Sequence, residues 1–252
     1  MEVERINILG VPVDTFNAED TENILLELLA RPGAKQIVFL SIWGLLKARG
    51  KNNFAECVKS ADLVIPVSKS ILRGAAFLKK KVPVRHNQFK IIINILSVLD
   101  SHLKSLYILG GRKKVLQKAQ GNVRRTFPNL NLVGRYVGHY PKKVEDSIIQ
   151  AIYKASPSLV LVSEGVKEKD CWPYNRRNRF ANSIFVYYKD VLGIFSEHIK
   201  RTKESTFEKG LEIWSEVFRN PLKIFLIFPY LYYIILLVLA YIQNYHTLLT
   251  RS

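Results

Sequence analysis

A strand–glycine–helix–strand pattern in residues 105–140 constrains the fold of this chain more than any other stretch. It opens with the apolar run Leu106-Tyr107-Ile108-Leu109, which is short and β-prone enough to be a buried strand. Gly110-Gly111 follow, and residues 113–126 carry apolar side chains at helical spacing on an otherwise basic segment. Residues 130–134 predict the next strand. The pattern predicts a βαβ unit, because parallel neighbouring strands need a crossover of this kind.

Gly110 and Gly111 admit two interpretations. Glycine lets a backbone approach a ligand closely, and the N-terminus of the helix that follows is a natural anion site. The same pair can instead make only a tight connection between a strand and a helix. The two glycines by themselves leave both interpretations open.

Apolar runs and amphipathic stretches alternate along almost the whole of the first 190 residues. The expected strands are residues 6–13, 37–40, 61–65, 159–163 and 183–188, in addition to the two described above. The expected helices are one capped by Asp20 or Thr21, then residues 41–49, 70–80, 90–101 and 142–155, and one near 172–179. This rhythm predicts an α/β fold with a mostly parallel sheet and helices on both faces.

Charge is the strongest signal in the composition. The 38 Lys and Arg residues outnumber the 21 Asp and Glu residues, which gives a formal net charge of +17. Such a surface attracts polyanions: nucleic acid, anionic lipid or phosphorylated substrates. Nucleic acid is disfavoured, because the chain has no reading motif and its aromatic side chains do not interleave with basic ones. The two cysteines are too few for a disulfide scaffold, which suits a reducing compartment.

The C-terminal part of the chain changes character. Residues 196–223 are polar and basic, whereas residues 224–242 carry no charge and are interrupted only by Pro229. Three interpretations remain open: a helix that spans a bilayer, for which about 20 apolar residues suffice, an interfacial or re-entrant segment broken at Pro229, and a buried core helix. If the segment spans, the basic residues before it predict that the main domain is cytoplasmic.

A set of short fragments carries a family resemblance. The fragments are Leu46-Lys47-Ala48-Arg49, residues 61–66, Leu109-Gly110-Gly111, residues 127–134, Gly138-His139-Tyr140, Trp172, Asn175-Arg176, Lys200-Arg201, Gly210-Leu211-Glu212, Trp214, Arg219 and Pro221. In this order and spacing, over roughly residues 6–223, they resemble the WecG/TagA/CpsF glycosyltransferases (glycosyltransferase family 26).

The resemblance implies an organisation and an activity. It implies a Rossmann-like domain over residues 1–195, a basic helical appendage over 196–223, a membrane-associated or transmembrane segment over 224–243 and a tail over 244–252. It also implies transfer of an N-acetylhexosamine-like unit from a UDP-sugar to a polyprenyl-diphosphate-linked acceptor, at the cytoplasmic face of the membrane, in making surface polysaccharide or a teichoic-acid-like polymer. The expected partners are therefore the nucleotide-sugar donor, the lipid-linked acceptor and the membrane, and a homo-oligomer is left open. No metal or other cofactor is expected, since the chain has no Asp-x-Asp pair and no metal-ligand spacing.

The chain departs from the family at several polar positions. The favoured catalytic Asp of the family corresponds to Val67, which cannot accept a proton. The Asn expected to contact substrate corresponds to Ser41, and the donor-binding Gln corresponds to Lys169. The family scaffold is therefore expected to be kept, with much of its polar pocket rewritten.

The remaining candidates follow from charge and from the resemblance. Arg85 is the best surviving diphosphate ligand, because a guanidinium binds phosphate oxygens in a bidentate way; the alternative is an ordinary solvated arginine. The resemblance places Gly110 and Gly111 by the nucleotide, and Lys169 can meet a phosphate as a point charge or remain a solvated lysine. His86 and His139 lie nearest the pocket segments and are candidates for the missing base, although a lone histidine is more often structural.

Two hypotheses follow. The first is an active membrane-associated glycosyltransferase, and the second is a catalytically inactive relative that acts as a membrane-anchored binding or scaffold protein of the same pathway. Val67 favours the second unless another group has taken over as base.

Overall fold

A six-stranded sheet forms the centre of the computed structural model, which describes residues 3–201, 207–208 and 227–249. The strand order is β4-β3-β8-β7-β5-β6, and each neighbouring pair is parallel. The strands are β3 (Lys35–Leu40), β4 (Leu63–Pro66), β5 (Ser105–Leu109), β6 (Asn131–Tyr136), β7 (Leu159–Val162) and β8 (Ile184–Tyr187). The predicted parallel sheet and the βαβ unit of β5, α6 (Lys113–Thr126) and β6 are confirmed.

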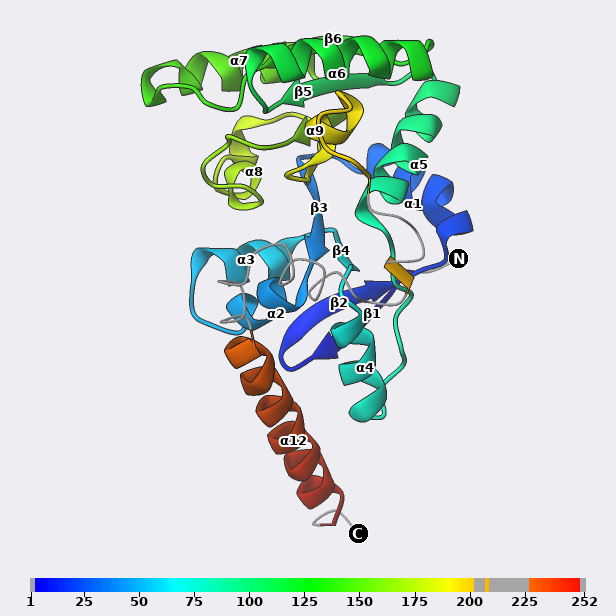
Figure 1. Cartoon of the computed structure of the whole chain (residues 1–252), viewed down its shortest axis with the longest axis vertical. Coiled ribbons are helices and arrows are strands. Elements are labelled where there is room, and N and C mark those ends of the chain that lie inside the picture. The colour runs from blue at the N-terminus through cyan, green and yellow to red at the C-terminus, as the bar shows by residue number, and fades with distance from the viewer. Residues whose placement is uncertain (1–2, 202–206, 209–226, 250–252) are drawn as a thin grey trace.

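Helices cover both faces of this sheet (Figure 1), because alternate strand residues bury apolar side chains on opposite sides. In β3, Ile37 and Phe39 face one core, and Val38 and Leu40 face the other. The first core is completed by α1 (Thr21–Ala30), α5 (Gln88–Ser101), α6 and α9 (Val191–Phe195). The opposite face is covered by α2 (Ile42–Ala48), α3 (Asn53–Ser60), α7 (Glu145–Ala155) and α8 (Cys171–Asn175).

The prediction of a single strand over residues 6–13 is wrong. The structure instead has a hairpin of β1 (Glu4–Ile8) and β2 (Val11–Thr15), reversed at Leu9 and Gly10, which both have positive φ. The buried Asp14 carboxylate joins this hairpin to β4: it accepts two hydrogen bonds from Arg5 (2.7 and 2.8 Å) and one from the Val64 amide (2.6 Å). The apolar run of residues 6–13 thus contains a hairpin turn, and Gly10 was its only signal in the sequence.

Several helix boundaries also differ from the expectation. Residues 142–155 form a short 3-10 turn, η2 (Lys142–Val144), followed by α7, and the segment near 172–179 divides into α8 and η3 (Arg177–Arg179). Helices α3 and α9 were not predicted. Asn52 caps α3 by accepting a hydrogen bond from the Ala55 amide, a local signal that short helices rely on.

The chain ends in α12 (Ile227–Leu249), which extends away from the α/β body past α2 and α4 (Lys69–Phe77) in Figure 1. One side of α12 packs on the body: Tyr233 and Leu237 are buried, and the Tyr233 hydroxyl donates to the Ser70 carbonyl at 3.0 Å. The other side leaves apolar side chains exposed, namely Phe228, Leu231, Tyr232, Ile234, Ile235, Val238, Leu239 and Ile242.

The expected transmembrane anchor is not supported. Over the residues that the structure describes, no helix is long and apolar enough to cross a membrane. The first residues of the predicted segment 224–242 lie outside the described residues. Most of the basic appendage expected at 196–223 also lies outside them.

Candidate active site

The carboxyl ends of the parallel strands gather most of the predicted site residues at one edge of the sheet. Ser41 follows β3, Val67 follows β4 and Gly110 follows β5. The connection from β5 leads to β6 on one side, whereas that from β7 leads to β8 on the other side. The order therefore reverses between β5 and β7, and ligands of open α/β sheets bind in the crevice outside such a reversal.

Three glycines allow loops to touch at this point. A Cβ atom on Gly138 would lie 2.1 Å from the Glu164 carbonyl oxygen and 3.0 Å from the Cα of Gly110, and one on Gly165 would lie 2.6 Å from the Nδ1 of His139. No side chain fits in this space. The loops after β5, β6 and β7 are thus held in direct backbone contact.

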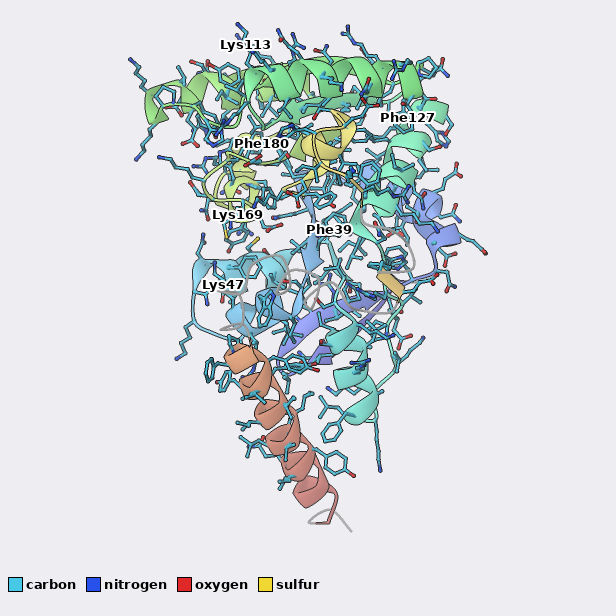
Figure 2. The ribbon with its side chains drawn as sticks, viewed as in Figure 1. Phe39, Lys47, Lys113, Phe127, Lys169 and Phe180 are labelled. Atoms are coloured by element: carbon cyan, nitrogen blue, oxygen red, sulfur yellow. The ribbon has the colours of Figure 1, made fainter. Side chains whose placement is uncertain are left out.

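The amides of Gly110 and Gly111 are already used. Gly110 N–H donates to the Tyr136 carbonyl (3.0 Å), and Gly111 N–H donates to the Glu164 carbonyl (2.7 Å). The two glycines therefore build the crevice rather than hold a phosphate through their own amides. The first turn of α6 opens directly after them, and its basic residues include Lys113 (Figure 2). An anion there would meet the positive end of a 14-residue helix.

Arg85 lies at the carboxyl end of β4 but is engaged from within the chain. Its Nε donates to the Val67 carbonyl at 2.8 Å, which holds the side chain beside the strand end. Its guanidinium stacks on the Phe207 ring at 3.8 Å and donates to the Phe207 carbonyl. A residue of the expected basic appendage therefore covers the best predicted phosphate ligand.

The two candidate histidines have different surroundings. His86 is buried, stacks on Phe16 with ring centroids 4.4 Å apart, and bonds the Phe16 carbonyl through Nε2 at 3.1 Å. Burial lowers the pKa of His86, so the ring is neutral and structurally engaged. His139 is exposed and lies against the Cα of Gly165 at the β5/β7 reversal. Of the two, only His139 can reach a ligand without rearrangement.

The other predicted positions serve local structure. Ser41 caps α2 by accepting from the Gly44 amide (3.1 Å), and the neighbouring Ser68 accepts from the Ile42 amide (3.0 Å). Val67 packs against the apolar core. The position that holds the favoured catalytic Asp in the family therefore carries an apolar side chain here. Lys169 is exposed, in left-handed backbone geometry (φ 52°) on the loop after β7, and lies on the same side of the molecule as Lys47 (Figure 2).

Carboxylates that the sequence reasoning missed surround the end of β8. Burial, together with the charges of Asp170, Asp190 and Glu164, raises the pKa of Tyr187 to about 12. Burial also raises the pKa of Asp170 to about 7, against the opposing effect of the Lys169 and Lys47 charges. A carboxyl group with such a pKa is half ionised near neutral pH, which suits proton transfer. The available signal was positional, because Glu164 and Asp170 lie on the loop that leaves β7.

A polar network fixes that loop to α7. Arg176 binds Glu168 (2.6 and 2.9 Å) and Glu145 (3.0 Å), and the Trp172 indole N–H donates to Glu145 at 2.9 Å. The Arg176 guanidinium keeps the pKa of Glu168 below its usual value. The motif residues Trp172 and Arg176 thus hold the loop in position.

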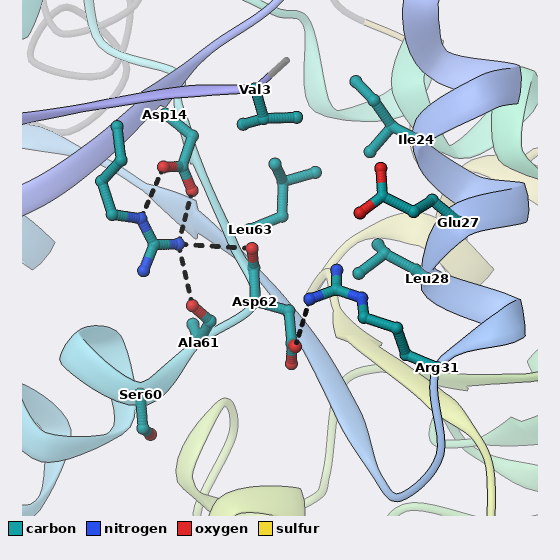
Figure 3. Close-up of a pocket in the computed structure, with 11 residues that line it drawn as sticks. Val3, Asp14, Ile24, Glu27, Leu28, Arg31, Ser60, Ala61, Asp62 and Leu63 are labelled. Carbon is teal, nitrogen blue, oxygen red and sulfur yellow. Dashed lines mark hydrogen bonds and ion pairs between the residues drawn. The ribbon is translucent and has the colours of Figure 1, made fainter. Parts of the chain in front are cut away.

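A cavity of about 680 Å³ opens at the opposite, amino-terminal edge of the sheet (Figure 3). Four of its five charged residues pair with one another: Arg5 with Asp14 at 2.7 Å, and Arg31 with Asp62 at 3.7 Å. None of the predicted site residues lines it. We therefore place the candidate site at the carboxyl edge and not in this cavity.

No cluster of three or more His, Cys, Asp or Glu side chains suited to a metal ion occurs in the described part of the chain. The described site thus consists of a glycine-built crevice, a basic helix start and carboxylates on the β7 and β8 loops. This combination supplies the positive end of a helix for an anion and, on the β7 loop, a carboxyl group that can accept a proton.

Comparison with known proteins relates this geometry to a family. The model of the glycosyl transferase WecG/TagA/CpsF family matches residues 6–247. The chain belongs to this family. The match covers the sheet, the crevice loops and α12, so the family resemblance of the short fragments is confirmed.

Two relatives are named N-acetylglucosaminyldiphosphoundecaprenol N-acetyl-beta-D-mannosaminyltransferase. The protein of Bacillus subtilis (strain 168) is 19% identical over 171 residues, which is 67% of this chain and 65% of the relative. The protein of Bacillus spizizenii is 21% identical over 164 residues, 65% of this chain and 63% of the relative. The chain is thus matched over slightly less than two thirds of the length of either WecG/TagA/CpsF relative.

Proposed function

We propose that this chain is a glycosyltransferase that moves an N-acetylhexosamine-like unit from a UDP-sugar to a polyprenyl-diphosphate-linked acceptor in cell-envelope polysaccharide biosynthesis. The observation that carries the proposal is the crevice at the β5/β7 reversal, where Gly110, Gly138 and Gly165 bring three loops into contact beside the start of α6. This is where open α/β folds bind nucleotides. The names of the two relatives support the acceptor class.

Asp170 is the proposed proton acceptor, in place of the acid that Val67 lacks. In the proposed reaction the carboxylate takes the proton of the acceptor hydroxyl, the hydroxyl oxygen attacks the anomeric carbon, and the bond from that carbon to UDP breaks. The leaving diphosphate gains negative charge, which the first turn of α6 and its lysines stabilise. Lys169 adds a point charge from the neighbouring loop. The reaction is proposed to need no metal, and chelation with EDTA is expected to leave its rate unchanged.

The acceptor's lipid makes a membrane surface the proposed place of work. The exposed apolar side of α12 supports this, and so does the basic α4 end, where Lys79 lies 5.9 Å from the Tyr241 ring centroid. Apolar side chains next to lysines are typical of segments that lie in an anionic lipid interface. Peripheral binding at the cytoplasmic face is therefore the proposed localisation.

A second candidate function is a catalytically inactive binding protein of the same pathway. Two observations favour it: Val67 stands at the family's acidic position, and Phe207 covers Arg85. In this case the protein would bind the lipid-linked acceptor without turning over a donor.

Calorimetry and a transfer assay separate the two candidates. We expect UDP to bind the full-length protein and Lys113→Ala, in the first turn of α6, to weaken that binding at least tenfold, whereas the control Arg125→Ala, at the far end of α6, leaves it unchanged. Transfer is then measured as extension of a polyprenyl-diphosphate-linked N-acetylglucosamine acceptor with UDP-N-acetylhexosamines. Binding without transfer under all donors would favour the inactive candidate, and no binding of UDP would contradict the donor site.

A further inference from the structure

The chain has two cysteines, and the fold brings them together. Cys57 lies on α3 and Cys171 begins α8, so 114 positions separate them in the sequence (171 − 57), yet α3 and α8 pack against each other on one face of the sheet. The Cys57 Sγ lies 3.4 Å from the carbonyl oxygen of Asp170, the residue before Cys171, and both cysteines are buried without a disulfide. Neither has a role in the proposed transfer reaction.

Neighbouring polar groups hold the pair in place. Gln36 Nε2 donates to the Asp170 carbonyl at 2.6 Å and lies 3.4 Å from the Cys57 Sγ, which in turn lies 3.4 Å from that same carbonyl. The residue that precedes Cys171 is thereby fixed over Cys57. Cysteines whose backbones are held against each other in this way can be joined with little movement of the backbone.

The two thiols are not equivalent. Cys57 is fully buried, whereas Cys171 retains 8% of its surface and begins a helix next to the loop after β7. The neighbouring Cys57 thiol lowers the pKa of Cys171, while the neighbouring Cys171 and burial raise the pKa of Cys57. Cys171 is thus the nucleophile and Cys57 the resolving partner, an arrangement typical of redox-sensitive cysteine pairs.

We propose that Cys57 and Cys171 form a reversible intramolecular disulfide when a hydroperoxide reaches the protein. The Cys171 thiolate attacks one peroxide oxygen, the O–O bond breaks, and a sulfenic acid forms as the other oxygen leaves as hydroxide or alkoxide and takes up a proton. The Cys57 sulfur then attacks the sulfenic sulfur, the S–O bond breaks, and the departing hydroxide takes the Cys57 proton to leave as water. Two thiols lose two electrons in total, and the peroxide is reduced by two.

The bond would act on the loop of the candidate site. Residues 163–170 run from the end of β7 to Cys171 and carry Glu164, Lys169 and Asp170. A covalent link from Cys171 to α3 adds a permanent bond to the hydrogen bonds that already hold this loop. Oxidation therefore ties the proposed proton acceptor to the rigid body of the protein.

Intact-mass spectrometry of the full chain tests the proposal. After treatment with an equivalent of hydrogen peroxide we expect the loss of two hydrogen atoms, no free thiol, a monomer on a non-reducing gel, and full reversal by dithiothreitol. Hydrogen exchange should slow in segment 163–171 of the oxidised protein. Two unreacted thiols, addition of oxygen without loss of hydrogen, a disulfide-linked dimer or unchanged exchange would each overturn it.

Single variants identify the order of reaction. Cys57→Ser should accumulate a sulfenic acid on Cys171 that dimedone traps, whereas Cys171→Ser should leave Cys57 unmodified under the same treatment. Trapping in the reverse order would overturn the assignment of nucleophile and resolving partner. The wild-type mass measurement does not depend on whether either variant folds.

Discussion

Asp170 occupies an environment that favours its neutral form, and this has consequences for rate and for stability. A buried carboxyl group is less stable as a charge, and the cations of Lys169 and Lys47 only partly offset the effect. The structure therefore holds a proton acceptor whose pKa is about 7, on the loop that leads from β7 to α8.

For the reaction rate, we predict that Asp170→Asn lowers kcat by about 10²- to 10⁴-fold, the usual contribution of a positioned base. In the wild type, kcat should rise with pH through about 7, since the carboxylate form is the active one. Steady-state transfer kinetics between pH 5 and 9 measure both effects.

The matched controls are Glu164→Gln and Asp190→Asn, which remove the neighbouring carboxylates but leave Asp170 in place. Each should reduce kcat far less and keep the rise near pH 7. If Glu164→Gln lost the activity and Asp170→Asn retained it, the assignment of the base would be wrong.

For stability, the pH dependence that Asp170 contributes to the free energy of unfolding is opposite in sign to that of an ordinary paired carboxylate. The pKa of Asp170 is raised from 3.8 to about 7 on folding, so between these values the folded state binds the proton that the unfolded state has lost. The free energy of unfolding contributed by this group therefore falls as pH rises from about 4 to 7. We predict that Asp170→Asn raises the melting temperature at pH 8 and changes it little at pH 4, as measured by circular dichroism; equal effects at both pH values would contradict the raised pKa.

How far the sequence predicts this site depends on the kind of residue. Gly110 and Gly111 could be singled out because a backbone that approaches another closely requires glycine, and their place beside a nucleotide stays a prediction. His86 was a candidate only by its sequence position, and its stacking on Phe16 depends on residues 70 positions away. Asp170 was missed because its raised pKa arises from burial by the fold, which no local pattern reports.

At the scale of elements, α12 packs against α2 and α4, and its tightest fit is at Gly74 of α4. Gly74 has no side chain there, and a Cβ atom at this position would lie 1.9 Å from the Tyr233 hydroxyl oxygen. That hydroxyl bonds the Ser70 carbonyl, so the contact combines a steric fit with a buried hydrogen bond. The gap in α4 and the tyrosine on α12 are therefore complementary.

We predict that Gly74→Ala loosens α12 and destabilises the protein by about 1–3 kcal/mol, the usual cost of overpacking. Tyr233→Phe should cost about 1 kcal/mol, the net value of a buried hydrogen bond. Limited proteolysis within residues 227–249 and urea unfolding measure the two effects.

Gly121→Ala on α6 is the control for the glycine substitution. A Cβ atom there meets nothing within 4 Å, so this change should stabilise the protein by about 0.5–1 kcal/mol through helix propensity. If Gly74→Ala were as mild as Gly121→Ala, the fit of Tyr233 against α4 would be refuted.

The elements themselves follow closely from the sequence, with instructive exceptions. Buried parallel strands appear in a sequence as continuous apolar runs. This pattern predicted β3, β5, β7 and β8. Residues 6–13 carried the same signal but fold as a hairpin, because Gly10 permits a reversal that hydrophobicity does not show. Short helices such as α9 lack enough turns for a periodic pattern, so their positions depend on packing.

At the scale of the whole molecule, an excess of basic charge and an exposed apolar helix face act together. A net charge of +17 attracts an anionic surface from a distance, and apolar contact then adds a term that salt does not screen. These are the two components expected of a peripheral membrane protein.

We predict that the full chain binds vesicles of phosphatidylglycerol and phosphatidylcholine more strongly than pure phosphatidylcholine vesicles, and that raising salt from 0.1 to 1 M weakens the binding without abolishing it. Replacing Leu231, Ile235 and Leu239 by Ser should remove the component that persists at high salt. Flotation or co-sedimentation measures the bound fraction.

The control replaces exposed residues on the far side of the body, Leu103 and Tyr153, by Ser, and binding should not change. Equal loss with both sets of substitutions, or no loss with the α12 set, would contradict α12 as the lipid-facing element.

The strand order has a consequence for the assembly of the chain during synthesis. β8 is the last strand of the sheet to leave the ribosome, yet it lies between β3 and β7 and bonds to both. Until residues 184–187 arrive, the nascent protein consists of two part-sheets, each with an open apolar margin. The final short strand therefore joins the two halves of the sheet. Chains that end before it should be substrates for chaperones or proteases.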